Sequence, residues 1–143
     1  MIPFAAAFVC PSMPVLDSAA ATILVVEDEP TVCELAAEAL IDEGYRVLTA
    51  ADAWEAEAIL ARESVDMLFT DIDLARNTDG LSLARWARGA CPDLRVVYTS
   101  GGRACLQAGE SVPDSVFLPK PYRPSQLVGL TRDVLHAGHR HHA

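Results

Sequence analysis

Five polar side chains in this sequence stand directly after short apolar runs, at positions where they could act together. They are Glu27, Asp28, Asp71, Ser100 and Lys120. Carboxylates held close together repel one another and raise each other's pKa unless a cation joins them. A hard divalent ion such as Mg²⁺ prefers such oxygen ligands. An ammonium and a hydroxyl nearby are suited to the oxygens of a phosphoryl group, so the set predicts metal-assisted phosphoryl chemistry.

Each of these residues alone has a more ordinary explanation. A single acid after a strand is usually the N-cap of the next helix. A single lysine is usually a solvated surface residue. Only the joint placement of the five residues at the ends of several strands favours a functional site.

The elements that must position these residues alternate between two hydrophobic patterns. Short β-branched apolar runs predict buried parallel strands, and the segments between them carry apolar residues at helical spacing. The expected strands are 22–26, 45–50, 66–70, 94–99 and 115–118. The expected helices are 30–43, 53–62, 80–88, 103–108 and 124–136. This (βα)5 count predicts an α/β fold, a doubly wound five-stranded parallel sheet with flavodoxin-like strand order 2-1-3-4-5.

In an open parallel sheet the ligand site lies beyond the carboxyl ends of the strands, which is where the five residues stand. Local signals support the helix boundaries. Pro30 suits a first helical turn, Gly44 a C-cap and Asp52 an N-cap. The fourth expected helix is weak, because glycines and a proline leave only 103–108 free of helix breakers. We therefore expect residues 101–114 to be short or irregular in structure, and more mobile than the other helices.

Composition limits the class of protein. The chain has 143 residues, enough for one domain, with 20 acidic against 11 basic residues and a formal charge of −9. Because this charge repels phosphate backbones and anionic lipids, we expect neither nucleic acid nor a membrane surface as partner. We expect one domain over 22–136, with a flexible extension at 1–21 and a flexible tail at 137–143.

Four cysteines are scattered through the chain with no metal-ligand spacing, which favours reduced thiols in a cytoplasmic protein. No apolar run approaches the ~20 residues of a membrane span. Residues 1–21 lack a basic start and contain three prolines, so a signal peptide is a poor interpretation.

Five segments in order along the chain resemble the receiver domains of two-component response regulators, of the stand-alone, chemotaxis-regulator-like type. They are Ile23–Pro30 (ILVVEDEP), Leu68–Asp73 (LFTDID), Asp79–Gly80, Val96–Gly101 (VVYTSG) and Phe117–Tyr122 (FLPKPY). The match extends from Thr22 to about Leu135, and the combination is far more specific than any single short motif.

The resemblance implies that Asp71 accepts a phosphoryl group from a sensor histidine kinase or a histidine phosphotransfer protein. Glu27 and Asp28 match the acidic pair that holds Mg²⁺, a metal that Asp71 would share. Asp73 matches the position that offers its backbone carbonyl to the metal. Lys120 matches the lysine that contacts the acceptor carboxylate and then the phosphoryl group.

The resemblance also implies a conformational switch. Ser100 and Phe117 match the hydroxyl and aromatic positions that move inward on phosphorylation, although Thr99 is an adjacent hydroxyl and strand register decides between the two. The bond before Pro121 is cis in this family. The chain departs from the family pattern at 74–78, which replaces the usual Met-Pro, and in the missing hydroxyl of Phe117.

Alternative functions follow from the same residues. Asp71-Ile-Asp73 resembles the nucleophile motif of haloacid-dehalogenase-like phosphatases, but Ala75 does not match that motif's last position. A degenerate receiver used only for docking would normally lack the acceptor or the lysine. We therefore expect no classical enzyme but a single-domain response regulator, which signals to a protein target or as a homodimer, relays phosphate, or drains it.

Overall fold

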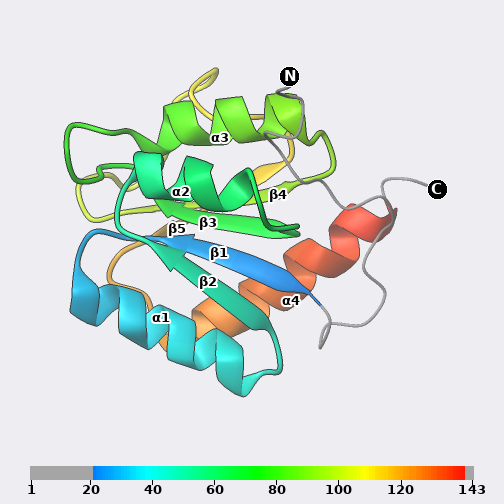
Figure 1. Ribbon diagram of the computed structural model, residues 1–143. Helices are drawn as coiled ribbons and strands as arrows, with labels where there is room; N and C mark the ends of the chain where they lie inside the picture. The colour runs from blue at the N-terminus through cyan, green and yellow to red at the C-terminus, as the bar shows by residue number, and fades with distance from the viewer. Residues whose placement is uncertain (1–20, 141–143) are drawn as a thin grey trace.

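The computed structural model describes residues 21–140, and these form a five-stranded parallel sheet with helices on both faces (Figure 1). The strand order is β2-β1-β3-β4-β5, which confirms the predicted order 2-1-3-4-5. The strands are β1 (Thr22–Val26), β2 (Arg46–Ala50), β3 (Met67–Asp71), β4 (Arg95–Ser100) and β5 (Ser115–Pro119). The helices are α1 (Pro30–Asp42), α2 (Ala53–Leu60), α3 (Gly80–Ala90) and α4 (Pro124–Arg140).

The two faces of the sheet are covered by different pairs of helices. In Figure 1, α2 and α3 lie above the sheet, and α1 and α4 lie below it. The alternation of side chains along each strand separates two hydrophobic clusters. Leu68 and Tyr98 pack with α2 and α3, whereas Phe69 and Val97 pack with α1 and α4. Because β1, β3 and most of β4 are buried on both faces, their sequences are mostly apolar, with polar residues at the strand ends.

The helices begin where the capping residues predict. The Asp52 carboxylate accepts a 2.9 Å hydrogen bond from the Glu55 amide, and the Asp79 carboxylate accepts a 2.8 Å bond from the Leu81 amide. Gly44 follows α1 with a φ of 98°, in the left-handed region that glycine enters without strain.

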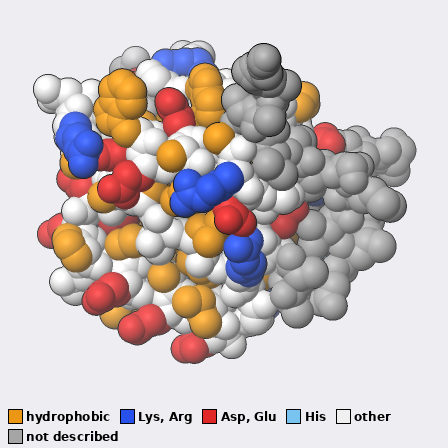
Figure 2. Space-filling model, viewed as in Figure 1, with side chains coloured by type: hydrophobic (Ala, Val, Ile, Leu, Met, Phe, Trp, Pro, Cys, Tyr) orange, Lys and Arg blue, Asp and Glu red, His pale blue; other side chains and the backbone are white. Residues whose placement is uncertain are grey.

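The exposed side of α1 carries both apolar and acidic residues. Leu35 and Ile41 are 55% and 53% exposed, and Glu34, Glu38 and Asp42 are exposed among them. Figure 2 shows red and orange side chains intermingled along this lower edge of the molecule. This helix surface is thus amphipathic and acidic.

Three expectations about the elements and the ends of the domain need correction. The fourth expected helix, at 103–108, is absent: residues 101–114 between β4 and β5 contain turns and bends but no helix. Their irregular structure is as predicted, whereas their mobility stays a prediction. Helix α4 continues to Arg140, past the boundary expected at 136, and Ala21 is fully buried rather than part of an extension.

Other expectations concern the ends of the chain and its cysteines. The extension at 1–20 and the tail at 141–143 lie outside the described residues. Cys33 and Cys105 are free thiols, but Cys91 is disulfide-bonded, so the expectation of reduced cysteines is wrong there. No helix in the described part of the chain has both the length and the apolar character needed to cross a bilayer.

Candidate functional site

Lys120 joins two buried carboxylates at the carboxyl ends of the strands. Its Nζ lies 2.7 Å from Oε1 of Glu27 and 2.8 Å from Oδ2 of Asp71. Glu27 directly follows β1, Asp71 ends β3, and Lys120 directly follows β5. The strand order therefore brings together residues from three separate parts of the sequence, as their positions after apolar strands predict.

Burial and charge oppose each other in this pair of contacts. Glu27 is 5% exposed, and burial raises its pKa, although the hydrogen bond from Lys120 partly offsets this rise. Burial alone would lower the pKa of Lys120, but its hydrogen bonds to Asp71 and Glu27 hold that pKa well above its usual value. Lys120 is therefore a permanent cation at this site.

A third carboxylate completes an acidic cluster. Oxygen atoms of Glu27, Asp28 and Asp71 all lie within 4.8 Å of one another, and Asp28 is exposed to solvent. Three carboxylates and one ammonium leave two excess negative charges, which a divalent cation would neutralise. An all-oxygen donor set with one solvent-facing side suits Mg²⁺, which usually retains several water ligands. These residues therefore fit a magnesium ion.

The backbone after Asp71 turns tightly around the carboxylate of that residue. The Asp73 amide donates to Oδ1 of Asp71 at 3.3 Å, and Asp73 pairs with Asp79 in an isolated antiparallel bridge. Gly80 then returns against the strand, since a Cβ added there would lie only 2.1 Å from the Asp71 carbonyl oxygen. Only glycine permits this close approach, a role that the Asp79-Gly80 motif did not reveal by itself.

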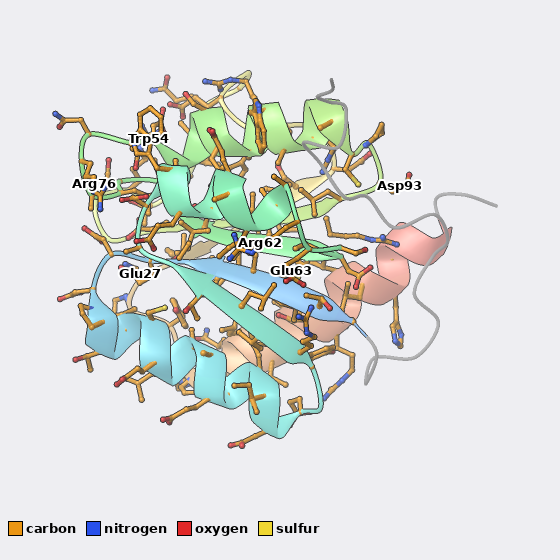
Figure 3. All side chains as sticks on the ribbon, in the orientation of Figure 1. Glu27, Trp54, Arg62, Glu63, Arg76 and Asp93 are labelled. Carbon is orange, nitrogen blue, oxygen red and sulfur yellow. The ribbon has the colours of Figure 1, made fainter. Side chains whose placement is uncertain are left out.

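The connection between β3 and α3 is tied to the start of α2. Arg76 Nε lies 3.0 Å from Oδ2 of the buried Asp52, and the Ala53 amide donates to the Thr78 hydroxyl at 3.1 Å. Arg76 and Asn77 have φ values of 59° and 56°. Figure 3 shows Arg76 at the same end of the molecule as Glu27, with Asp93 at the opposite end. Sequence reasoning noted this segment as unusual but missed its contacts.

Strand register distinguishes the two adjacent hydroxyls. Asp71 pairs with Thr99, whereas Ser100 pairs with Pro119 one position further along. Because side chains alternate between the faces of a sheet, Thr99 shares the face of Asp71 and Ser100 points to the other. The Thr99 hydroxyl is buried and has no hydrogen-bond partner within the described residues, while Ser100 Oγ accepts from the Gly102 amide at 3.2 Å. Ser100 is also the last residue of β4, and its carbonyl accepts from the Lys120 amide at 3.0 Å, so its role as the switch residue stays a prediction.

The segment around Lys120 is held by its neighbours. The Lys120–Pro121 peptide bond is cis, and the Tyr122 ring meets Phe69 edge to face at a centroid distance of 5.7 Å. Burial raises the pKa of Tyr122 to about 12, so the phenol stays neutral. Phe117 is partly buried and packs against the α2 and α3 side of the sheet.

Sequence comparison finds a family model and curated relatives that match most of this chain. The family model for the response regulator receiver domain matches residues 23–132. The alginate biosynthesis transcriptional regulatory protein AlgB of Pseudomonas aeruginosa is 36% identical over 107 residues, which are 73% of this chain and 24% of AlgB. The nitrogen assimilation regulatory protein NtrX of Azorhizobium caulinodans is 35% identical over 79% of this chain and 26% of NtrX. The chain thus spans about a quarter of the length of these relatives.

Solved structures of similar size share the fold. A response regulator receiver protein from Sinorhizobium medicae has a TM-score of 0.78 and 33% identity, with 83% of this chain and 97% of that one covered. A CheY-like receiver domain from Methanospirillum hungatei has a TM-score of 0.76 over 85% of this chain and 98% of that one. Its 24% identity supports the fold alone.

Proposed function

The chain belongs to the response regulator receiver domain family, and we propose that it accepts a phosphoryl group on Asp71 from a phosphohistidine. The observation that carries this proposal is the pair of contacts from Lys120 to Asp71 and Glu27 at 2.8 and 2.7 Å, beside the exposed carboxylate of Asp28. The acceptor, its cationic partner and a metal-binding cluster occupy one edge of the sheet.

The transfer breaks the P–N bond of the phosphohistidine and forms an O–P bond to a carboxylate oxygen of Asp71, while the imidazole leaves. A carboxylate is a weak nucleophile, so the transfer depends on in-line approach and charge neutralisation. Lys120 supplies one cation for the phosphoryl oxygens. Mg²⁺, held by Glu27, Asp28, Asp71 and the Asp73 carbonyl, would supply the remaining positive charge.

The hydroxyl proposed to answer phosphorylation is that of Ser100, the last residue of β4, whose carbonyl accepts from the Lys120 amide at 3.0 Å. Its Oγ accepts from the Gly102 amide at 3.2 Å, a contact that it would exchange for a phosphoryl oxygen. Inward movement of Ser100 would leave space for Phe117, and phosphorylation would then shift the population toward that state.

The partners follow from this chemistry. The phosphodonor is a sensor histidine kinase or a histidine phosphotransfer protein, and the output is binding of a protein target, homodimer formation, onward relay or drainage of phosphate. The proposed location is the cytoplasm, on the basis of family membership and not of cysteine chemistry. Phosphatase turnover of the haloacid-dehalogenase type is the minor alternative, and release of phosphate from an aryl phosphate would favour it.

We expect Asp71→Asn to abolish labelling of the protein by acetyl phosphate with Mg²⁺. The amide has the size of the carboxylate but not its nucleophilicity, so the fold is retained. Phosphoprotein gel electrophoresis measures the labelling. Asp66→Asn is the matched control, because Asp66 is equally buried (6% exposed) but precedes β3 at the opposite end of that strand. Wild-type labelling of the Asp71 variant would overturn the assignment of the acceptor.

Mg²⁺ should stabilise the fold, because it relieves repulsion among Glu27, Asp28 and Asp71. For a site half-occupied at about 1 mM, 10 mM Mg²⁺ would add about 1.4 kcal/mol to the free energy of unfolding. Thermal unfolding across a millimolar titration measures this effect. Asp28→Ala should erase the response, whereas Asp42→Ala, which removes an exposed acid of α1, should leave it unchanged. A melting temperature that ignores Mg²⁺ would contradict the metal site.

A further inference from the structure

The chain that leaves β4 runs directly against the lysine of the site. A Cβ added at Gly101 would lie 3.8 Å from Cδ and 3.9 Å from Cβ of Lys120. Thr99, two positions earlier, is in register with Asp71. Arg103 therefore leaves the backbone at the rim of the acceptor site, close enough for a long side chain to matter there.

Arg103 is at present paired with a carboxylate of its own segment. Its Nη1 lies 2.7 Å from both carboxylate oxygens of Glu110. Glu110 also accepts from the Gln107 amide at 2.8 Å, and its carbonyl accepts from Arg85 of α3 at 3.2 Å. In the described chain, only Nη1 of the Arg103 guanidinium donates, so its other donors are available.

The surroundings of Arg103 extend toward the acceptor. The hydrogen bond to Glu110 raises the pKa of Arg103, and the charges of Asp73 and Asp79 add to this rise. Asp73 is two residues from the acceptor and pairs with Asp79 in the isolated bridge. The carboxylates of Asp73 and Asp79 are thus near enough to the Arg103 guanidinium to affect its pKa.

The segment has room to move. Gly102 and Gly109 have open space where a side chain would be, and Gly109 has a φ of 87°. These glycines bracket the stretch that contains Arg103 and precedes Glu110. No helix constrains residues 101–114.

We propose that Arg103 is a second phosphoryl-binding cation, which exchanges the Glu110 carboxylate for the phosphoryl oxygens on Asp71. This inference rests on the proposed function. The phosphoryl group carries about −1.5 to −2 charge against the single charge of a carboxylate. A guanidinium matches phosphoryl oxygens with two parallel hydrogen bonds, so the exchange favours the phosphorylated state. Release of Glu110 would also loosen its contacts with Gln107 and Arg85, and so carry the signal toward α3.

The test measures affinity for beryllofluoride with Mg²⁺, a phosphoryl mimic, by calorimetric titration of the full chain. Arg103→Gln should weaken binding about tenfold, as expected for loss of a charge-assisted hydrogen bond. Glu110→Gln removes the competing carboxylate and should tighten binding about threefold. Arg123→Gln removes an exposed cation that follows Lys120 closely, and it should change affinity by less than about twofold.

The signs of these effects separate the possibilities. If the Arg103–Glu110 ion pair only holds the segment together, Arg103→Gln and Glu110→Gln should change the affinity for beryllofluoride in the same direction. That outcome would overturn the inference. An equal loss in the Arg123 variant would mean a general charge effect and would also overturn it. If wild-type protein fails to bind beryllofluoride, or Asp71→Asn binds equally well, the proposed function itself fails.

Discussion

Two connections flank Asp71, and they are held in different ways. Residues 72–79, between β3 and α3, are fixed along their length by Arg76 to Asp52, by Thr78 to Ala53 and by the close approach of Gly80 to Asp71. Residues 101–114, between β4 and β5, are fixed mainly at their far end. There the Val112 amide donates to the buried Tyr98 hydroxyl at 3.1 Å, and Arg88 donates to the Pro113 carbonyl at 2.6 Å.

The difference indicates a division of roles around one carboxylate. The first connection presents the backbone of Asp73, the expected metal ligand, and metal ligands need fixed geometry. The second borders Lys120 through Gly101 and carries Arg103, whose pairing with Glu110 we propose to be exchangeable. Residues 72–79 thus form a rigidly held connection on one side of Asp71, and residues 101–114 form a less constrained connection on the other.

The largest expected effect comes from Gly80→Ala, which disrupts the end of the rigidly held connection. The added methyl group would overlap the Asp71 carbonyl oxygen, so the α3 start and the acceptor strand must separate. We expect a loss of about 3 kcal/mol in the free energy of unfolding, measured by urea denaturation. Gly89→Ala, in the same helix with open space around it, should instead gain about 0.5 kcal/mol. Equal changes in the free energy of unfolding of the two variants would contradict a rigidly held connection.

Tyr98→Phe tests the anchored end of the second connection and should have an intermediate effect. It leaves the Val112 amide without its acceptor in a buried position, at a cost of about 1–2 kcal/mol. Hydrogen exchange at the Val112 amide should accelerate while the α3 amides stay protected. Tyr45→Phe, also buried, should change the free energy of unfolding by less than about 0.5 kcal/mol. Unchanged protection at Val112 would show that this bond does not anchor the segment.

Arg76→Ala should have the smallest effect. The Arg76 side chain is 68% exposed, so its ion pair with Asp52 contributes about 0.5 kcal/mol. Asp52 keeps its bond to the Glu55 amide, and Thr78 keeps its bond to Ala53. Thermal unfolding measures the loss, with exposed Arg62→Ala of α2's C-terminal turn as the control. A loss above about 2 kcal/mol in the free energy of unfolding would mean that the rigidly held connection depends on Arg76.

The sequence was sufficient for the strands and for most of the site. Buried parallel strands are continuously apolar and β-branched, so Thr22–Val26 was predicted with its observed bounds. Residues after such strands converge at one edge of the sheet, which is why Glu27, Asp28, Asp71 and Lys120 could be grouped without coordinates.

What the sequence could not supply depends on contacts between distant segments. The positions of Thr99 and Ser100 relative to Asp71 are set by the pairing of β4 with β3, and counting from a strand start does not determine that register. The missing helix at 103–108 was expected to be weak, since under two turns cannot sustain itself. Asp52 was predicted as a helix N-cap, but it also forms an ion pair with Arg76 of the connection between β3 and α3. No local sequence pattern predicts that second contact.

The contacts of Lys120 have a consequence for a chain still being synthesised. The bond to Asp71 spans 49 positions of sequence, and Glu27 lies farther away still. The acidic residues emerge from the ribosome with β1 and β3, but their cation arrives only with the segment after β5. A nascent chain that stops before β5 therefore carries the acidic cluster without its lysine. On the proposed function, competence to accept a phosphoryl group would thus be acquired last, and a translation product truncated before β5 would not be phosphorylated.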